Sequence, residues 1–507
     1  MKSLLLFCIF AISTAAGYHI LCIQKAPTKS HNHLLKGIVD PLLKAGHEVT
    51  FITHYPDGKT VKNLNIIDAS HMRKLKEGID IINSVRASIT LVKDFGKNLS
   101  LALLDTPVIH DAVAKGNYDA VVTEWFFSDV EAGYASVLQV PWILLSGTVL
   151  YPHLEYLVDT VRSIPNVPSF VDNYSVPMTF RQRFMNAFIF VMSQIDYYWN
   201  DFPSQKAIYE SRFGPIAKAR GVPLPPYEEA YRNVSILLVN SHPSFAPTRS
   251  LPPNVIDIAG YHIDATIPPL PKDLQDILDG SPQGVIYFSM GSVVKSAQLE
   301  EKTRKELIKV FGEVKQTVLW KFEEKIDGLP KNVHVRPWMP QPSILAHPNV
   351  KLFITHGGLL STLESLQYGV PLLAIPVFGD QPGNAHRSVV AGHALKVDFS
   401  PDMAPKLKEA LHEMMRNDSY YNKAKYISKL FHNRPTKPTD LITHYVEMAI
   451  ESQGAYHLRS SVNQYKWYEN WMLDIIFVIL AALYVVLYII KKVIKSFTKK
   501  EKKQKKN

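Results

Sequence analysis

Cysteine is nearly absent from this sequence, because its 507 residues include only Cys8 and Cys22. Cys8 lies in residues 1–17, where Lys2 precedes an apolar run and then a group of small residues, the layout of a signal peptide that is cleaved from the mature chain. Only Cys22 then remains, so no disulfide can form within the chain. A chain of this length buries enough surface to be stable without one.

The sequence also lacks a motif for a bridging metal. No Asp-x-Asp triplet occurs anywhere in it. The oxygen-rich site expected for a divalent cation that bridges a diphosphate is therefore not visible, and we predict neither a metal nor another cofactor.

Little net positive charge lies outside the C-terminus, although the net charge of the whole chain is +10. Nine lysines and one acid, Glu501, follow Ile490, so this tail carries +8 of the total. Once Lys2 leaves with the signal peptide, the body carries about +1. A nucleic-acid partner would need a basic patch on the folded body, so we predict none and interpret the tail as cytosolic under the positive-inside rule.

One long apolar run lies near the C-terminus. Residues 473–492 are long enough for one transmembrane helix, and residues 453–472 form a juxtamembrane segment with Trp and Tyr, as expected at a membrane interface. With residues 493–507 cytosolic, the body is lumenal and the protein is single-pass type I. Lys503 and Lys505 resemble the retrieval signal of endoplasmic-reticulum membrane proteins, and a tail merely attracted to membrane lipid is the alternative. Four acceptor sequons fit a lumenal body, at Asn98, Asn173, Asn233 and Asn417.

Between these ends the sequence alternates short apolar runs with helical stretches. Near-continuous apolar strands separated by helices indicate a parallel sheet covered on both faces. Clustered prolines, including Ile267 to Pro271, mark a linker. We therefore predict an α/β protein with two doubly wound, Rossmann-like domains, residues 18–265 and 266–452, facing each other across a cleft. Residues 151–220 are aromatic-rich and helical; we favour a core helix there, with a pocket lid or a membrane-facing patch as alternatives.

The densest chemistry lies between Trp338 and Gln381. Val350 to Thr355 is predicted to be a strand, His356-Gly357-Gly358 a turn, and Ser361 to Gln367 the start of a helix. Unpaired amide groups and the helix dipole favour a phosphate at such a helix start. By residue type, His356 and Ser361 add donors to the phosphate, Glu364 accepts from ribose hydroxyls, Trp338 offers a flat face to a base, and Asp380 and Gln381 bind sugar hydroxyls.

The same run resembles the signature of the UDP-glycosyltransferases, the UDP-glucuronosyl and glucosyltransferase family of animals and plants. Weaker similarity extends from Tyr18 to the basic tail, and the HGGLLS form and the tail layout are most similar to insect members. The resemblance implies a GT-B architecture, in which residues 18–265 bind the acceptor and residues 266–452 bind the UDP-sugar. Many relatives have Asn where this chain has Leu360, so Ser361 and backbone amides would cover that phosphate contact. The matching positions are Trp338, Pro340, Gln341, Thr355, His356, Gly357, Gly358, Ser361, Glu364, Pro371, Pro376, Asp380 and Gln381.

Transfer of a sugar from UDP to a hydroxyl needs a base for the acceptor proton and stabilisation of the departing diphosphate. His31 follows the first predicted strand, where an open α/β sheet places reactive groups, and it matches the catalytic histidine of the family; His33 is a near competitor. The resemblance assigns the carboxylate that orients this histidine to Glu124, where vertebrate relatives have Asp. Asp129 is the alternative orienting residue.

On the leaving-group side, Ser292 follows a predicted strand and is a candidate phosphate ligand. Lys321 occupies the place of a basic residue in some relatives, but because it is a lone lysine we favour a surface position for it. The predicted UDP-binding residues are Ser292, Trp338, Gln341, His356, Gly357, Gly358, Ser361 and Glu364, and the predicted sugar-binding residues are Asp380 and Gln381.

We therefore predict a UDP-glycosyltransferase that moves a hexose, with inversion, from UDP-glucose or UDP-glucuronic acid to a hydroxyl of a small lipophilic acceptor. Glucose is the favoured sugar, as in the insect-like relatives. The sequence is compatible with an oligomer. The alternative is a catalytically inactive, transferase-like membrane protein that binds nucleotide sugars or lipophiles, for which Leu360 and Glu124 are the motivating departures.

Overall fold

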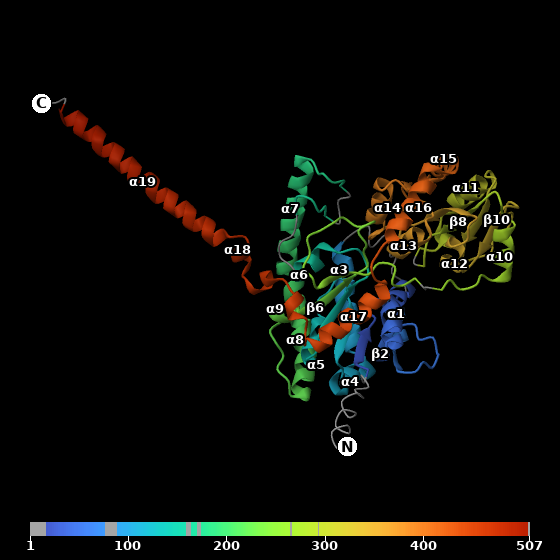
Figure 1. The fold of residues 1–507 in the computed structure, drawn as a ribbon, viewed down its shortest axis with the longest axis horizontal. Coiled ribbons are helices and arrows are strands. Elements are labelled where there is room, and N and C mark those ends of the chain that lie inside the picture. The colour runs from blue at the N-terminus through green and yellow to red at the C-terminus, as the bar shows by residue number, and fades with distance from the viewer. Residues whose placement is uncertain are drawn as a thin grey trace, which may run out of the picture.

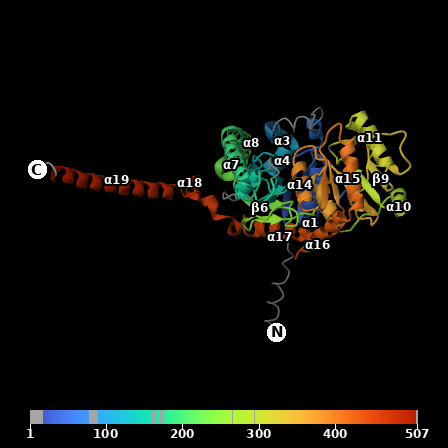
Figure 2. The same cartoon turned by 90° about the horizontal axis from the view of Figure 1, so that it is seen from above.

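The computed structural model describes residues 17–76, 89–158, 164–169, 174–263, 266–292 and 294–504. Two parallel β-sheets covered by helices form the body, and one long helix projects from it (Figures 1 and 2). The first sixteen residues of the predicted signal peptide and Asn173 of the second sequon lie outside the described residues.

The first sheet has seven parallel strands in the order β3-β2-β1-β4-β5-β6-β7. The chain winds outward in one direction from β1 and in the other from β4, so the carboxyl ends of β1 and β4 form a switch point where ligands bind in such sheets. All residues of β4, β5 and β6 are buried, which explains their near-continuous apolar sequences. The strands are β1 (His19–Ile23), β2 (Glu48–Thr53), β3 (Leu64–Asp68), β4 (Ala120–Glu124), β5 (Trp142–Ser146), β6 (Val234–Val239) and β7 (Val255–Asp257).

Helices cover both faces of this sheet. They are α1 (Lys29–Lys44), the 3-10 helix η1 (Ser70–Lys76), α3 (Ile89–Leu104), α4 (Pro107–Lys115), α5 (Ala132–Leu138), α6 (Pro152–Val158), α7 (Phe180–Asp196), the π-helical turn η2 (Tyr197–Asp201), α8 (Phe202–Arg220) and α9 (Tyr227–Ala230).

The second sheet has six parallel strands in the order β10-β9-β8-β11-β12-β13, with its switch point between β8 and β11. The two doubly wound sheets confirm the predicted fold class. The strands are β8 (Val285–Ser289), β9 (Thr317–Lys321), β10 (Val333–Arg336), β11 (Val350–Thr355), β12 (Leu372–Ala374) and β13 (Ala394–Lys396). The helices are α10 (Lys272–Asp279), η3 (Ser296–Gln298), α11 (Glu301–Gly312), α12 (Gln341–Leu345), α13 (Leu359–Tyr368), α14 (Gln381–Val390), α15 (Ala404–Arg416) and α16 (Ser419–His432).

The chain returns to the first domain after α16. Helix α17 (Pro438–Glu451) buries Ile442, Val446 and Ala449 in the same apolar core as α1 and the strands of the first sheet. This helix lies within residues 266–452, which the sequence groups with the second domain. Helix α17 therefore belongs to the packing of the first domain, where it contacts α1.

An apolar cluster also joins the domains directly. Val149, Phe245 and Ala259, which follow strands of the first sheet, pack against residues of α13 and α16 such as Leu363 and Phe431. The two sheets therefore turn their carboxyl ends toward one another. Residues that follow strands of different domains can meet there in one site.

Helix α7 is not the core helix that the sequence favours. Phe184, Phe188, Val191 and Ile195 recur along one face and are all exposed, and on η2 Trp199 is 80% exposed. The same apolar period is expected for a helix that faces a protein core and for one that faces any other apolar surface. The two kinds of helix differ in the exposure of their apolar side chains, which cannot be inferred from the spacing of those residues in the sequence.

The C-terminal segment leaves the body on the side where α7 lies, as both views show (Figures 1 and 2). Short helices η4 (Tyr456–Leu458), η5 (Ser461–Gln464) and α18 (Trp467–Asn470) lead into α19 (Leu473–Gln504). Residues 473–497 are long and apolar enough to cross a membrane and are not buried against the body, which fits the predicted span. The helix continues beyond residue 492 into the lysine-rich segment.

Candidate active site

A histidine and a carboxylate meet at the switch point of the first sheet. His31 lies in the first turn of α1, where its backbone N–H is capped by the side chain of Thr28. Its Nδ1 is 2.5 Å from Oε1 of Glu124, the last residue of β4. The Glu124 side chain is fully buried, whereas that of His31 is 23% exposed. The Nε2 side of the imidazole thus remains available to a substrate.

The Glu124 side chain is longer than the Asp of vertebrate relatives, and a glycine just after the neighbouring strand β5 leaves room for it. Gly147 follows β5, and a Cβ atom at this position would lie only 2.9 Å from Oε1 of Glu124 and 2.8 Å from Leu34. The ring of Phe126 packs edge-on against His31 at a centroid distance of 5.3 Å. The imidazole is therefore held by the carboxylate on one side and by an aromatic ring on another.

The electrostatic setting of His31 favours the imidazolium. Burial opposes the charged form, but the charge and hydrogen bond of Glu124, together with the more distant Asp380, more than offset it, so the pKa of His31 is raised. Asp380 belongs to the second domain. Its influence on His31 shows that the two domains share one electrostatic site.

In the second domain His356 directly follows β11, and its ring is enclosed by glycines. A Cβ atom on Gly291 or on Gly358 would approach this ring to 2.5 Å, so neither position accepts a side chain without a shift. Burial, reinforced by the charge of Lys321, lowers the pKa of His356 to about 4. A neutral imidazole therefore lies beside the N-terminus of α13, where unpaired amides favour an anion.

Three of the predicted nucleotide ligands contact one another. Nε2 of Gln341, at the start of α12, donates to Oγ of Ser361 at 2.9 Å and to Oε2 of Glu364 at 2.7 Å. Burial raises the pKa of Glu364 to about 7, although the bond from Gln341 opposes the rise. The cluster places an amide, a hydroxyl and a titrating carboxylate along the first turns of α13.

Trp338 offers an open aromatic face, because 62% of it is exposed. Two lysines lie over its ring, Lys29 of the first domain at 5.1 Å and Lys321 at 5.9 Å from the centroid. Lys321 also donates to Glu323 at 2.8 Å and to the carbonyl of Gly291 at 2.9 Å. Ser292 is exposed after β8. The sequence did not single out Lys29, whose closeness to Trp338 depends on the docking of the domains.

Asp380 and Gln381 lie at the start of α14, and both side chains accept hydrogen bonds within the protein. Oδ2 of Asp380 accepts a hydrogen bond from Asn384 at 2.7 Å, while Oε1 of Gln381 accepts from the backbone N–H groups of Val377 and Phe378. The Asp380 carboxylate also accepts from the backbone N–H of Leu359, which begins α13. Both side chains therefore have a fixed orientation before any sugar binds.

Leu360 has a packing role. It contacts the apolar cluster beneath the first sheet, although it belongs to α13 of the second domain. The residue that departs from many relatives therefore helps to dock the two domains.

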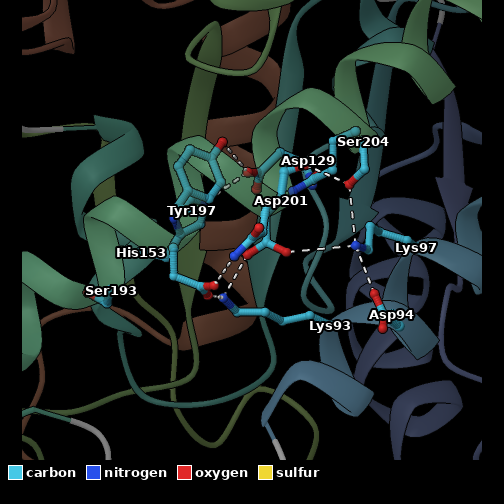
Figure 3. Close-up of polar contacts among 12 residues, drawn as sticks. Lys93, Asp94, Lys97, Asp129, His153, Ser193, Tyr197, Asp201 and Ser204 are labelled. Atoms are coloured by element: carbon cyan, nitrogen blue, oxygen red, sulfur yellow. Dashed lines mark hydrogen bonds and ion pairs between the residues drawn. The ribbon is translucent and has the colours of Figure 1, made fainter.

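Asp129 does not contact His31 among the described residues. Its carboxylate lies 2.7 Å from Nε2 of His153 and accepts from Tyr197, and Figure 3 shows this cluster next to Asp201. The sequence left two candidates for the carboxylate that contacts His31. In the structure Glu124 contacts His31, and Asp129 contacts His153, which the sequence did not single out. His33 is exposed on α1, with its ring against His262.

The sequons occupy different settings. Asn98 and Asn233 are exposed, and Asn233 accepts a hydrogen bond from Arg459. Asn417 is half-buried, and its amide donates to Glu413.

Known proteins resemble this chain over most of its length. Residues 49–507 match the family model described as UDP-glucoronosyl and UDP-glucosyl transferase. The chain is 30% identical to UDP-glucosyltransferase 2 of Dactylopius coccus, over 94% of this chain and 93% of that one. The chain belongs to this family. It is 26% identical to UDP-glucuronosyltransferase 2B7 of Homo sapiens, over 90% of this chain and 88% of that one.

Solved structures share the fold at low identity. A UDP-glucosyltransferase from Polygonum tinctorium superposes with a TM-score of 0.58 at 18% identity, covering 87% of this chain and all of that one. The calicheamicin glycosyltransferase CalG4 gives 0.56 at 16% identity, covering 87% and 98%. The predicted GT-B fold is confirmed. Relatives and fold support transfer of a sugar from a UDP-sugar to an acceptor, and nothing favours the inactive alternative.

Shortening Glu124 should separate it from His31. In Glu124→Asp the carboxylate loses one methylene of reach, and a lost hydrogen bond to a charged group corresponds to about 10-fold to 150-fold in turnover. Gly147→Ala should act in the same direction, because the new methyl group would displace Oε1. Steady-state turnover with an aliphatic alcohol acceptor measures both effects. Glu48→Asp, an exposed change on β2, is the matched control, and full activity of Glu124→Asp would contradict the proposed pairing.

Affinity for UDP should depend on pH through Glu364. With a pKa of about 7 this carboxyl is mostly protonated at pH 6 and mostly ionised at pH 8, and the ionised form is the better acceptor for ribose hydroxyls. Affinity should rise by up to about 10-fold over this range. Glu364→Gln should lose this rise and keep only the part due to titration of the nucleotide. Calorimetry at both pH values makes the comparison, and parallel pH profiles of the two proteins would count against it.

Proposed function

We propose that this chain transfers a hexose with inversion from a UDP-sugar to a hydroxyl of a small lipophilic acceptor. The observation that carries the proposal is the paired, partly open His31 of the first domain, which lies within electrostatic reach of Asp380 of the second. A base on one domain and a nucleotide site on the other fit attack from the face of the sugar opposite the diphosphate.

In the proposed mechanism, Nε2 of His31 accepts the proton of the acceptor hydroxyl as its oxygen attacks the anomeric carbon. Glu124 keeps the proton of His31 on Nδ1 and stabilises the imidazolium that forms. The bond from the anomeric carbon to the diphosphate oxygen breaks, and its electrons leave with UDP. The amides at the start of α13, with His356 beside them, stabilise the negative charge on UDP.

The donor side of the proposal rests on α13 and its neighbours. Trp338 would stack with uracil, Glu364 and Gln341 would bind the ribose, and Ser292, Ser361 and the Gly357 and Gly358 amides would bind phosphates. Asp380 and Gln381 would bind the sugar. Glucose is preferred over glucuronic acid, since the relative from Dactylopius coccus is named a glucosyltransferase. No metal is invoked, because buried donors and a helix terminus can stabilise the leaving group.

We also propose that the protein resides in the endoplasmic-reticulum membrane with its body in the lumen. Supporting features are the apolar α19, the lysines that follow it and the sequons on the body. The sugar acceptors would then be lipophilic compounds that partition into or cross this membrane.

Removing the base should abolish turnover without removing the nucleotide. His31→Ala should lower turnover by about 10² to 10⁴, the usual contribution of general base catalysis, while UDP still binds to the other domain. The acceptor must be an aliphatic alcohol, because a phenol can ionise without help. His33→Ala, two residues away on the exposed side of α1, is the matched control. Retention of full activity in the His31 variant would remove this residue from the mechanism, and UDP binding without any turnover in the native protein would support the binding-protein alternative.

Protease should reach only the tail in sealed microsomes. Digestion should remove an epitope placed after residue 497 and leave the body intact, because the membrane shields the lumen. Digestion after detergent treatment is the control. Loss of the body in intact vesicles would reverse the proposed orientation.

A further inference from the structure

A second pair of histidine and carboxylate lies in the first domain. Nε2 of His153 is 2.7 Å from Oδ2 of Asp129, which also accepts hydrogen bonds from Trp125 Nε1 and Tyr197 OH (Figure 3). Asp129 is almost completely buried, so its carboxylate is held by these three side chains rather than by water. His153 thus donates from Nε2. Its other nitrogen, Nδ1, makes no hydrogen bond to any residue that the structure describes.

His153 forms part of the wall of a cavity of about 120 Å³. An apolar cavity of about 150 Å³ is enough to hold benzene, so this space suits roughly one aromatic ring. The ring of Trp125 stacks on His153 with a centroid distance of 5.8 Å. Further rings complete the wall, from Phe127, Tyr151, Phe190 and Tyr197.

One short loop connects this cavity to the proposed catalytic pair. Glu124 and Asp129 stand at its two ends, and between them Phe126 packs on His31 while Phe127 lines the cavity. The two phenylalanine rings are 5.5 Å apart. Phe127 has a φ of 52°, a left-handed conformation that is unusual for a bulky residue and marks a constrained site. Aromatic rings in contact with one another therefore connect His31, the proposed base, to the cavity.

The charges around the cavity disfavour an anion. Lys93 lies 2.6 Å from Asp201 and 2.6 Å from Asp196, so its charge is already neutralised (Figure 3 shows Lys93 and Asp201). Asp129 adds a second carboxylate to the cavity wall beside Asp201. A neutral group that donates a hydrogen bond fits this setting better than a carboxylate does.

We propose that His153, positioned by Asp129, binds a second hydroxyl of the acceptor, remote from the hydroxyl that receives the sugar. The inference rests on the proposed function, because it names the class of acceptor: aromatic compounds with hydroxyl groups at both ends. The distal ring occupies the cavity and its hydroxyl donates to Nδ1 of His153. The reacting hydroxyl then lies near His31.

Three biphenyls test this assignment: 4-phenylphenol, 4,4′-dihydroxybiphenyl and 4′-hydroxybiphenyl-4-carboxylate. The native protein should favour the diol over 4-phenylphenol in kcat/KM by about 2-fold to 10-fold after correction for its two equivalent hydroxyls, the effect of one neutral hydrogen bond. The carboxylate should be the weakest substrate. His153→Ala should remove the preference and leave transfer to 4-phenylphenol, while His153→Gln, which keeps a hydrogen-bonding side chain, should retain part of it.

Binding measured by tryptophan fluorescence separates this inference from the proposed function. Trp125 stacks on His153, so the diol should change the emission of the native protein and not that of Trp125→Phe. Absence of transfer with intact binding of the diol would refute the proposed function alone. An equal preference in native protein and His153→Ala, or a stronger response to the carboxylate, would overturn the hydroxyl site; a thermal melt checks that each variant is folded.

A different observation concerns the outer face of α7. Its exposed residues include Phe180, Phe184, Phe188, Met192 and Ile195. Residues on the opposite face of the helix, such as Phe190, line the cavity. A soluble surface rarely leaves a continuous apolar stripe of this length uncovered.

The length of chain before α19 limits how far its first residue can lie from this apolar stripe. Asn463 donates to the carbonyls of Leu157 and Val158 at the end of α6, which lines the same cavity as α7. Ten residues from Asn463 to Leu473 span at most about 35 Å even when fully extended. Both views place α7 on the side from which α19 leaves (Figures 1 and 2).

We propose that the outer face of α7 lies in the interface of the bilayer that α19 crosses. An amphipathic helix with Phe along one face, followed by the exposed Trp199 of η2, is suited to this position, and Arg181 and Arg183 at its start can reach lipid phosphates. The cavity on the inner face of α7 would then be separated from lipid by a single helix.

Site-specific labelling of the full chain in liposomes tests this position. Cys22 is buried, so the thiol of Phe188→Cys can be labelled selectively with a fluorophore. Nitroxide lipids should quench this label strongly and should not quench a label at Lys305→Cys, an exposed site on α11 of the second domain. Equal quenching at the two sites would overturn the proposal. So would a label at Phe188→Cys that is insensitive to the nitroxide lipids and cross-links between copies, which would instead identify a second copy of the chain as the partner.

Discussion

A carboxylate that is fully removed from water must be paired, and the buried Glu124 at the end of β4 is paired with His31. This requirement determines the position of α1, since the imidazole must reach the strand end while the helix still buries its apolar face on the sheet. The returning α17 packs behind α1. His31, the proposed base, therefore lies on a helix that packs between the first sheet and α17, with its imidazole paired to the buried Glu124.

The donor site depends on tight packing. The ring of His356 is enclosed by Gly291 and Gly358 at distances that admit no side chain, so the glycines of the motif serve the histidine as much as the phosphate. Leu360, beside them on α13, packs against the first domain. At this position the chain makes apolar contact between the domains. We propose that phosphate binding relies on backbone amides and Ser361.

The sequence predicts the two sheets and the cluster of Gln341, Ser361 and Glu364, because continuous apolar strands and a strand, turn and helix have strong local patterns. It assigned the carboxylate to Glu124 only by resemblance and left Asp129 as the alternative, since both lie at or just after the end of β4 and the contact depends on the path of the loop through Phe127. For α7 it favoured a core helix over the exposed alternative, and it missed the return of α17. Neither of those has a local signal, because an apolar helix face looks the same whatever covers it.

The loop from Glu124 to Asp129 brings two requirements together. Its ends each hold a carboxylate that pairs with a histidine from a different helix, and Gly96 of α3 approaches the loop so closely that a Cβ there would lie 2.5 Å from the carbonyl of Phe126. The loop is fixed at both ends and packs against Gly96, so its backbone has little freedom to adjust to different acceptors. Variation in acceptor shape must then be accommodated by α7 on the other wall of the cavity, whose outer face has no packed protein neighbour to hold it among the described residues. We therefore propose that the loop fixes the reacting hydroxyl against His31, while α7, nearest the proposed membrane surface, adapts to the shape of the acceptor.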